Sequence, residues 1–295
     1  MTNTPLRQLI ERRMPENGLV QTGVRGVQLF RATDPLPCIP AVYEPCVIAI
    51  VSGAKEAVFD GRRHVYDHRD YLICPLSMPV EAGTPTAAPD NPLMGVYIAL
   101  DTRLMTELTL DMNQATAAAG PVAEARGIRL SPWDDGFDEA LLRLVQLDDP
   151  TDRAILGEAR LRELHYAILK GDAGAFARQA FAPGNGIARA ISHLSNNLHD
   201  TVSIGDMATR AGMSRAVFHR KFKQATTMSP IQFVKGIRLN KAAMRIAQGL
   251  TVNEAATEVG YASPSQFSRE YNRMYGAPPR EDINRLRGSA EAMGL

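Results

Sequence analysis

Five polar side chains in residues 260–282 have the types and spacing to read a nucleic acid. If this stretch is helical, Phe267 and Tyr271 lie about 40° apart and form its buried stripe. Arginine, glutamine and asparagine carry donors whose geometry matches the edges of guanine and adenine in the major groove. The stretch carries such side chains opposite the aromatic residues and on one flank: Ser265, Gln266, Arg269, Asn272 and Arg273. This face predicts contact with double-stranded DNA.

An earlier stretch carries the same arrangement. Phe218 and Phe222 lie four residues apart and form the buried stripe of another predicted helix. The opposite face carries short and basic side chains: Ala216, His219, Arg220 and Lys223. A polar face on one isolated helix is usually only solvated, so the DNA interpretation depends on the pattern occurring twice.

The two stretches belong to an internal repeat. Ile204, Ala208 and Gly212 recur 48 residues later as Val252, Ala256 and Gly260. Ser214, Phe218, Arg220, Phe222 and Pro230 recur 49 residues later as Ser263, Phe267, Arg269, Tyr271 and Pro279. The spacing changes by one residue where "GMS" in the first copy becomes "GYAS" in the second. Such a duplication indicates one supersecondary unit used twice.

Each copy contains signals that start helices. Three pairs fit the capping box, in which two side chains satisfy free amides of the first turn: Ser203 with Asp206, Thr251 with Glu254, and Ser263 with Gln266. Pro264 takes the first helical position, where its missing N–H costs nothing. Each copy is therefore predicted as a short helix, a turn with a glycine and a second helix, which is the helix-turn-helix arrangement.

The charge of the chain is unevenly distributed. The whole chain has 33 Lys+Arg and 32 Asp+Glu, but residues 186–295 hold 15 basic and 8 acidic residues. A basic module on an acidic body predicts that the module meets a polyanion. No apolar run is long enough for a membrane helix, and the three cysteines contain no CxxC pair, so we expect a cytoplasmic protein without a disulfide framework or a thiolate zinc site.

The body is predicted to be mixed. Over about residues 20–100, apolar runs such as "CVIAIVSG" and "LMGVYIAL" alternate with turns, and Asp60-Gly61 is a hairpin dipeptide. This indicates a small antiparallel barrel or sandwich. Residues 101–181 read as helical, with two apolar faces: Phe137, Leu141, Leu144 and Val145, then Leu161, Leu164, Ile168 and Leu169. Gly171 is placed to end the second helix, and "APGNG" at residues 182–186 reads as a linker.

The barrel offers candidates for a ligand pocket: Phe59, Tyr66, Tyr71, Cys74 and Tyr97. Aromatic residues on strands usually fill the core, and a cysteine senses electrophiles only if its pKa is lowered. Few cations cluster here, which favours an uncharged or weakly charged organic ligand. His64 and His68 do not have the spacing of a cupin metal pair, so we expect no metal and no cofactor.

The quoted motifs resemble a known family. "SIGDMATRAGMSRAVFHRKFKQATTMSPIQFVKGIRLNKAAMRI" and "GYASPSQFSREYNRMYGAPP" closely resemble the DNA-binding domain of the AraC/XylS family of bacterial transcription regulators. The resemblance implies seven helices, a connecting helix at about residues 230–248, and second helices that enter successive major-groove segments about one helical turn apart. It selects Ala216, His219 and Arg220, then Ser265, Gln266 and Arg269, as base-facing. Since Ala216 is short, base reading by the first helix rests on His219 and Arg220.

The N-terminal part resembles the same family more loosely, through "LRELHYAILKGDAGAFARQAF" at residues 161–181. The resemblance implies a cupin-like barrel with attached helices that binds a small effector, dimerises, or does both. The predicted fold class is thus α+β, with a cupin-like domain at residues 1–181, a linker at 182–186 and an all-α DNA-binding domain of two helix-turn-helix units at 187–295.

The predicted function is a sequence-specific, effector-responsive transcription activator that acts as a homodimer without catalysis. Its expected partners are double-stranded DNA, a small-molecule effector and RNA polymerase. Two alternatives stay open: a cupin-type enzyme that carries an accessory DNA-binding module, and a constitutive DNA-binding protein whose barrel only dimerises.

Overall fold

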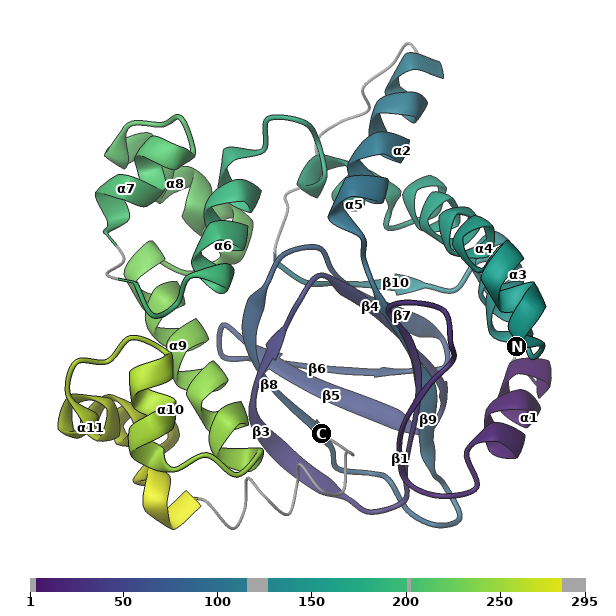
Figure 1. Cartoon of the computed structure of the whole chain (residues 1–295), viewed down its shortest axis with the longest axis horizontal. Coiled ribbons are helices and arrows are strands. Elements are labelled where there is room, and N and C mark those ends of the chain that lie inside the picture. The colour runs from purple at the N-terminus through teal and green to yellow at the C-terminus, as the bar shows by residue number, and fades with distance from the viewer. Residues whose placement is uncertain (1–3, 116–126, 201–202, 283–295) are drawn as a thin grey trace.

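The computed structural model describes residues 4–115, 127–200 and 203–282 (Figure 1). The first part of the chain forms two antiparallel sheets, with strand orders β1-β2-β9-β4-β7-β10 and β3-β8-β5-β6. The strands are β1 (Gly18–Gln21), β2 (Val27–Ala32), β3 (Leu36–Tyr43), β4 (Cys46–Ser52), β5 (Ala54–Phe59), β6 (Arg62–Asp67), β7 (Asp70–Cys74), β8 (Met78–Thr84), β9 (Leu93–Ala99) and β10 (Arg129–Pro132). The sheets face each other as two halves of a barrel (Figure 1), which confirms the predicted cupin-like architecture.

The hairpin between β5 and β6 turns at the predicted dipeptide. Asp60 and Gly61 have φ of 51° and 68°, and Phe59 pairs with Arg62 across the turn. A two-residue hairpin loop of type I′ requires positive φ at both central positions, which aspartate and glycine supply most cheaply. The dipeptide therefore fixes the register of the hairpin.

Strand β4 shows why its sequence is a continuous apolar run. All seven of its residues are buried. Alternate side chains of a strand face opposite sides, and those of Ile48 and Ile50 join the core between the sheets. Val47 and Val51 face the other way, into a core that the helices cover. A strand covered on both faces favours apolar side chains, and the polar Ser52 stands at the end of β4.

Five helices accompany the barrel: α1 (Thr4–Arg13), α2 (Thr102–Ala115), α3 (Asp135–Val145), α4 (Pro150–Lys170) and α5 (Gly174–Ala180). The predicted apolar face of α3 is buried against the outer face of the larger sheet, as is most of that of α4. Phe137 is fully buried and stacks on Tyr71 with ring centroids 4.1 Å apart. Burying such a side chain contributes roughly 1.5–3 kcal/mol. Helix α4 ends before Gly171, as expected.

Two features of this region differ from the sequence prediction. Residues 129–132 form β10 within the stretch expected to be helical, because they pair with β7 at the edge of the larger sheet. Helix α1 precedes the barrel and fits its Leu6 and Ile10 into the outer core. Both elements are short, and tertiary pairing rather than local pattern decides their conformation.

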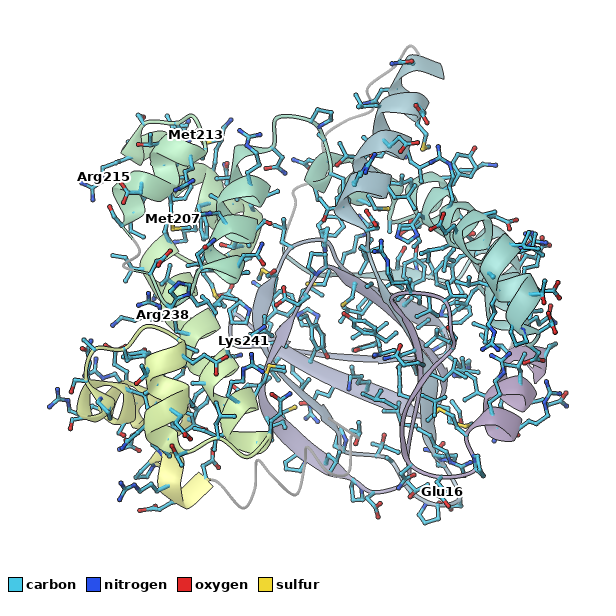
Figure 2. All side chains as sticks on the ribbon, in the orientation of Figure 1. Glu16, Met207, Met213, Arg215, Arg238 and Lys241 are labelled. Carbon is cyan, nitrogen blue, oxygen red and sulfur yellow. The ribbon has the colours of Figure 1, made fainter. Side chains whose placement is uncertain are left out.

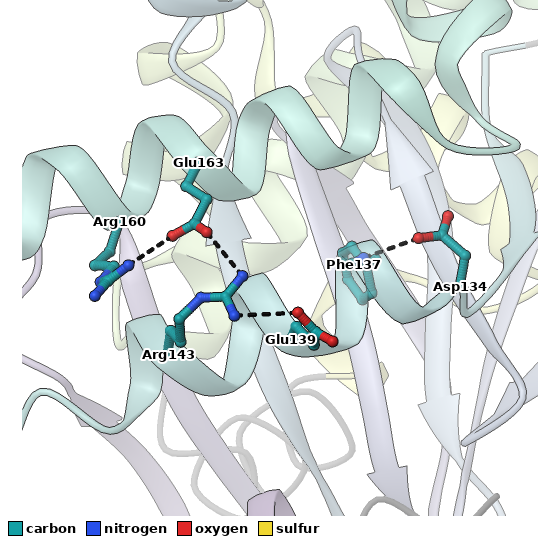
Figure 3. A network of polar contacts seen from close by, with 6 residues as sticks. All are labelled: Asp134, Phe137, Glu139, Arg143, Arg160 and Glu163. Atoms are coloured by element: carbon teal, nitrogen blue, oxygen red, sulfur yellow. Dashed lines mark hydrogen bonds and ion pairs between the residues drawn. The ribbon is translucent and has the colours of Figure 1, made fainter.

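Polar contacts join α3 to α4 (Figure 3). The Arg143 guanidinium contacts the Glu163 carboxylate at 2.7 Å and that of Glu139 at 3.2 Å, and Arg160 reaches Glu163 at 3.0 Å. At the start of α3, the side chain of Asp134 accepts a hydrogen bond from the Phe137 amide at 2.9 Å. Because the ion pairs are about a third exposed or more, we attribute the position of the helix pair mainly to its apolar face.

The second part of the chain is helical: α6 (Gly186–Asn196), α7 (Ile204–Arg210), α8 (Arg215–Thr226), α9 (Pro230–Ala247), α10 (Val252–Glu258) and α11 (Pro264–Tyr275). A seventh helix begins at Pro279, and its end lies outside the described residues. Helix α9 serves two cores, since Phe233 and Ile237 pack with the first repeat while Leu239 and Ile246 pack with the second. No helix within the described ranges is long and apolar enough to cross a membrane.

Helix α9 also lies against β3 and β8 of the barrel (Figure 1). Asn240 is 2% exposed, and its amide donates to the carbonyl oxygens of Ala41 and Val80, both at 2.6 Å. Its own oxygen accepts a hydrogen bond from the Tyr275 hydroxyl. Beside it, the Lys241 ammonium lies 3.2 Å from the Glu44 carboxylate. One face of α9 thus joins the helical part to two adjacent barrel strands.

Candidate nucleic-acid interface

Helices α7 and α8 form the first helix-turn-helix unit, and α10 and α11 form the second. The Ser203 side chain accepts hydrogen bonds from backbone amides at the start of α7. Asp206 does not return a bond to Ser203, so only half of this predicted capping box is present. Ser214 caps α8 in the same way, through the amide of Val217. The boundaries of the first unit therefore follow the predicted signals.

The second unit contains one complete capping box. Thr251 and Glu254 satisfy each other's backbone amides at the start of α10, as predicted. Ser263 caps α11, but the Gln266 side chain donates to Glu270 at 3.3 Å instead of returning a bond to Ser263. The returned bond of a capping box would need the Gln266 side-chain oxygen to accept from the Ser263 amide, so only half of this predicted capping box is present.

The turns of the two units explain the one-residue change in repeat spacing. Gly212 and Gly260 adopt φ of 68° and 84°. The next backbone amide returns to the first helix in both copies: Met213 to Ala208 at 2.9 Å, and Tyr261 to Ala256 at 3.0 Å. The two copies therefore have the same spacing up to the residue that donates this hydrogen bond. The extra residue of the second copy is Ala262, which is exposed just before the cap of α11.

The aromatic stripes of α8 and α11 are buried as predicted. Phe218 and Phe222 have no exposed surface, and their ring centroids lie 5.2 Å apart. Phe267 and Tyr271 repeat this arrangement at 5.6 Å, and the Tyr271 hydroxyl donates to the Asp282 carboxylate at 2.8 Å. Burial of one face fixes the rotation of each helix, so the opposite face is held toward solvent.

Eight of the nine predicted DNA-facing residues are exposed, and His219 is partly exposed. Within α8 and within α11 they form one face each, and Figure 1 places the two units toward opposite ends of α9. Arg220, Lys223 and Arg269 have no ion-pair partner among the described residues. Arg273 stands apart, because it lines a cleft of about 520 Å³ between α11 and the barrel hairpin. The arrangement leaves cationic groups free for an anionic partner.

Arg238 of α9 was not selected from the sequence, yet it connects the segment after α6 to the turn of the second unit. Its guanidinium donates to the carbonyl oxygens of Leu198 and Asp200 at 3.0 and 2.8 Å, just after α6. It also approaches the turn of the second unit at Gly260. The sequence pattern around Arg238 looks the same as that around an arginine exposed to solvent. Its role cannot be predicted from that pattern, because its partners are backbone carbonyls distant in sequence.

The two turn glycines, Gly212 and Gly260, allow the same substitution to be compared at equivalent positions of the repeat. A Cβ at Gly260 would lie 2.5 Å from the Leu198 oxygen, whereas a Cβ at Gly212 meets nothing within 4 Å. Both substitutions incur the cost of positive φ, about 1 kcal/mol. We expect Gly260→Ala to destabilise the protein by about 1–2 kcal/mol more than Gly212→Ala in denaturant titrations. Equal effects would show that the contact with Leu198 does not constrain the second turn.

The residues predicted to line a ligand pocket in the barrel do not all face the same space. Phe59, Tyr66 and Cys74 belong to the core between the sheets, and Tyr97 packs against it. Tyr71 instead faces the helices and stacks on Phe137. A pocket between the sheets therefore cannot contain Tyr71, because adjacent strand positions point to opposite faces.

The cysteines do not have the environment of reactive thiols. Burial raises the pKa of Cys38 to about 12 and raises the pKa of Cys46 and Cys74 further. The Cys74 thiol donates to the Leu76 carbonyl oxygen at 3.0 Å. A sensor of electrophiles needs a stabilised thiolate, and these sites stabilise the neutral thiol.

The two histidines of the barrel hairpin also lie apart. His64 stacks on Phe59, with ring centroids 4.5 Å apart, while His68 is exposed in the next turn. In the described part of the chain, no group of three or more His, Cys, Asp or Glu side chains is placed to hold a metal ion.

Comparison with known families now identifies the arrangement. A family model described as AraC-type transcriptional regulator N-terminus matches residues 23–176, more than half of the chain, and a helix-turn-helix domain model matches residues 207–285. The chain belongs to the AraC family of transcription regulators.

Curated relatives of this AraC-family protein match over a limited length. The HTH-type transcriptional regulator ArgR of Pseudomonas aeruginosa is 28% identical over 105 residues, which are 35% of this chain and 32% of ArgR. The regulator MtrA of Neisseria gonorrhoeae is 33% identical over 94 residues, 32% of this chain and 31% of MtrA. The chain thus matches about a third of the length of these relatives.

Solved structures of ToxT from Vibrio cholerae share the fold of this AraC-family protein along most of the chain. ToxT bound to (E)-4-(8-methylnaphthalen-1-yl)but-3-enoic acid has a TM-score of 0.60 at 10% identity, covering 89% of this chain and all of ToxT. ToxT bound to an unsaturated fatty acid has a TM-score of 0.57 at 12% identity, covering 93% and 99%. At such identity the likeness concerns the order and packing of the domains.

Proposed function

We propose that this AraC-family protein is a sequence-specific DNA-binding transcription regulator that reads DNA with α8 and α11. The observation that carries the proposal is the repeated unit: two capped helices, fixed by buried aromatic pairs, each hold toward solvent an arginine that has no ion-pair partner among the described residues. Arg220 and Arg269 occupy equivalent places in the repeat. Each guanidinium would form a bidentate contact with one guanine, in successive major-groove segments about 34 Å apart.

The remaining cations would anchor the complex. Lys223 at the end of the first reading face is exposed, and the surrounding domain carries the basic excess. Phosphate contacts orient a protein on DNA without distinguishing sequences, and they make binding salt-dependent. Residues 187–295 would thus supply both anchoring and reading, as a unit that functions without catalysis.

The barrel would provide control. Both ToxT structures hold an organic acid, and the shared domain order supports a small effector for this chain. Effector binding at residues 1–181 would shift the position of the helical domain through the contact between α9 and strands β3 and β8. We propose activation, through RNA polymerase in the cytoplasm, as the output of this shift.

The proposal is tested by footprinting the purified full chain on genomic fragments selected for binding. We expect protection of two adjacent major-groove segments on one face of the DNA, about one helical turn apart, and a binding constant that falls steeply with salt. Binding without preference among sequences, or protection of a single segment, would refute the reading by two helices.

Dimerisation would use an exposed apolar surface on α2 and α4. Ile155 is 70% exposed, Tyr166 is 43% exposed on the same face of α4, and Leu110 of the neighbouring α2 is 43% exposed. Contiguous exposed apolar patches commonly mark a protein contact, and we propose that these three side chains belong to one. Ile155→Glu would place a charge there, and we expect it to weaken self-association at least tenfold in analytical ultracentrifugation. Ile231→Glu, at a 54% exposed position of α9, is the control and should leave self-association unchanged.

A further inference from the structure

Lys55 occupies an unusual position for a lysine. In β5 it shares the inward face with Ala57 and Phe59, both of which belong to the core between the sheets. Its cross-strand partner is Tyr66 of β6, which is 2% exposed. Directly paired residues of an antiparallel ladder point to the same face. The Lys55 ammonium therefore enters the space enclosed by the two sheets.

No anionic partner meets this ammonium. Among the described residues, Lys55 makes no ion pair and no hydrogen bond, and the only groups that act to raise its pKa are the thiols of Cys38 and Cys46. The effect of burial is larger than the effect of the thiols and lowers the pKa of Lys55 to about 8. Lys55 nevertheless keeps part of its surface accessible, as does Tyr97 on the facing sheet. Since the side chain of Lys55 starts on the inward face of β5, we take this accessible surface to border the space between the sheets.

Two buried hydroxyl groups next to this lysine have only each other as partners among the described residues. Tyr43 and Tyr66 are 8% and 2% exposed, and neither hydroxyl has a hydrogen bond to any other described group. The two hydroxyls lie close enough to influence each other's pKa, which burial raises in both. Buried polar groups in folded proteins are nearly always bonded, and a bond between the two hydroxyls uses only one of their two O–H donors. The remaining donor beside an unpaired cation indicates a place for a missing acceptor.

We propose that the barrel interior binds a small organic monoanion, such as a carboxylate, between the Lys55 ammonium and the hydroxyls of Tyr43 and Tyr66. The ammonium and the hydroxyls can all donate, so the complementary ligand carries an acceptor with negative charge. Phe59 belongs to the core between the sheets and Tyr97 packs against it, so both suit an apolar body of the ligand. This assignment rests on the proposed function, since it names the chemical class of the effector. It also narrows the uncharged or weakly charged organic ligand expected from the sequence to a monoanion.

The site has a short route to the DNA-binding helices. Tyr43 lies two residues along β3 from Ala41, whose carbonyl accepts the Asn240 amide of α9. A ligand that bonds Tyr43 would thus act on the strand that holds the helical domain. Because the contact is direct, no change in the rest of the barrel is required.

The test uses the full chain and two defined acids, hexanoate and 3-phenylpropionate, with their amides as neutral controls. We expect isothermal titration calorimetry to show binding of at least one acid and at least tenfold weaker binding of its amide. Lys55→Met should weaken acid binding about 10- to 100-fold, because it removes a charge-assisted bond. Tyr66→Phe should weaken it less, and Lys241→Met, which removes a lysine outside the barrel, should leave it unchanged. Failure of both acids to bind, equal binding of acid and amide, or unchanged binding by Lys55→Met overturns the proposal.

A measurement on the wild-type protein does not depend on the folding of any variant. Reductive methylation of lysines, followed by peptide mass spectrometry, should show Lys55 protected by hexanoate and Lys241 unprotected. Equal labelling of Lys55 with and without hexanoate would count against the site. DNA footprinting without any acid tests the proposed function separately, so specific DNA binding together with absent acid binding refutes only the ligand assignment.

Discussion

Replacing Arg269 with alanine is expected to weaken binding to the specific operator by about 1–3 kcal/mol, roughly 5- to 150-fold. The guanidinium is exposed opposite the buried Phe267 and Tyr271 and has no ion-pair partner in the described part of the chain. The loss should be confined to specific DNA, with a relaxed preference at one base pair. Competition binding with operators substituted at each position measures both effects.

The internal repeat supplies the matched variant. Arg220→Ala, at the equivalent position of the first unit, should relax a different base pair about one helical turn from the first. Arg245→Ala serves as the control, because that guanidinium pairs with Glu258 at 2.7 Å and is not in either reading face. If Arg269→Ala weakens specific and random DNA equally, this arginine contacts phosphate and does not read a base.

Much of the DNA-binding part could be predicted from the sequence because its signals are local. Caps, turn glycines and aromatic pairs four residues apart each act within one or two helical turns, and the repeat presents them twice. The one-residue change in spacing is explained by Ala262, which is inserted after the bond that closes the turn. The exposed positions followed directly from the buried stripe. Their contacts with bases stay predictions.

The barrel was predicted in outline and not in its connections. Asp60-Gly61 identified one hairpin, since a two-residue turn acts locally. By contrast, β9 lies between β2 and β4, and β10 pairs with β7 after a long excursion through α2. Such pairings depend on contacts between distant residues. Lys55 could have been recognised as inward-facing, because it stands two and four residues before Ala57 and Phe59 in a strand whose turn was already identified.

The contact between the domains was the feature that could least be predicted from the sequence. Asn240 appears in "IRLNKAAM" as an ordinary polar residue of a helix. Only the fold shows that its amide reaches two adjacent strands while its oxygen accepts from Tyr275. An asparagine with 2% exposure and bonds at both ends is a fixed connection between barrel and helices.

Replacing Asn240 with leucine is therefore expected to have the largest effect on the coupling of the two domains. The variant fills a similar volume but removes the donor to the carbonyls of Ala41 and Val80 and the acceptor of Tyr275. Leaving such groups buried without partners costs about 1–3 kcal/mol each, so we expect the contact to weaken by roughly 2–5 kcal/mol. Hydrogen exchange of β3 and α9 should rise, and thermal unfolding should separate into two transitions.

The neighbouring Lys241→Met provides the control for this variant. Its ammonium pairs with Glu44, but the two side chains are 29% and 43% exposed, so its loss should change stability by less than about 1 kcal/mol. Operator binding by Asn240→Leu should persist, since the faces of α8 and α11 are held by their own aromatic cores. Its response to a barrel ligand should disappear, because the strand that the ligand contacts no longer holds α9. A single unfolding transition with unchanged exchange in β3 would show that the apolar contacts alone fix the domains, and that Asn240 transmits nothing.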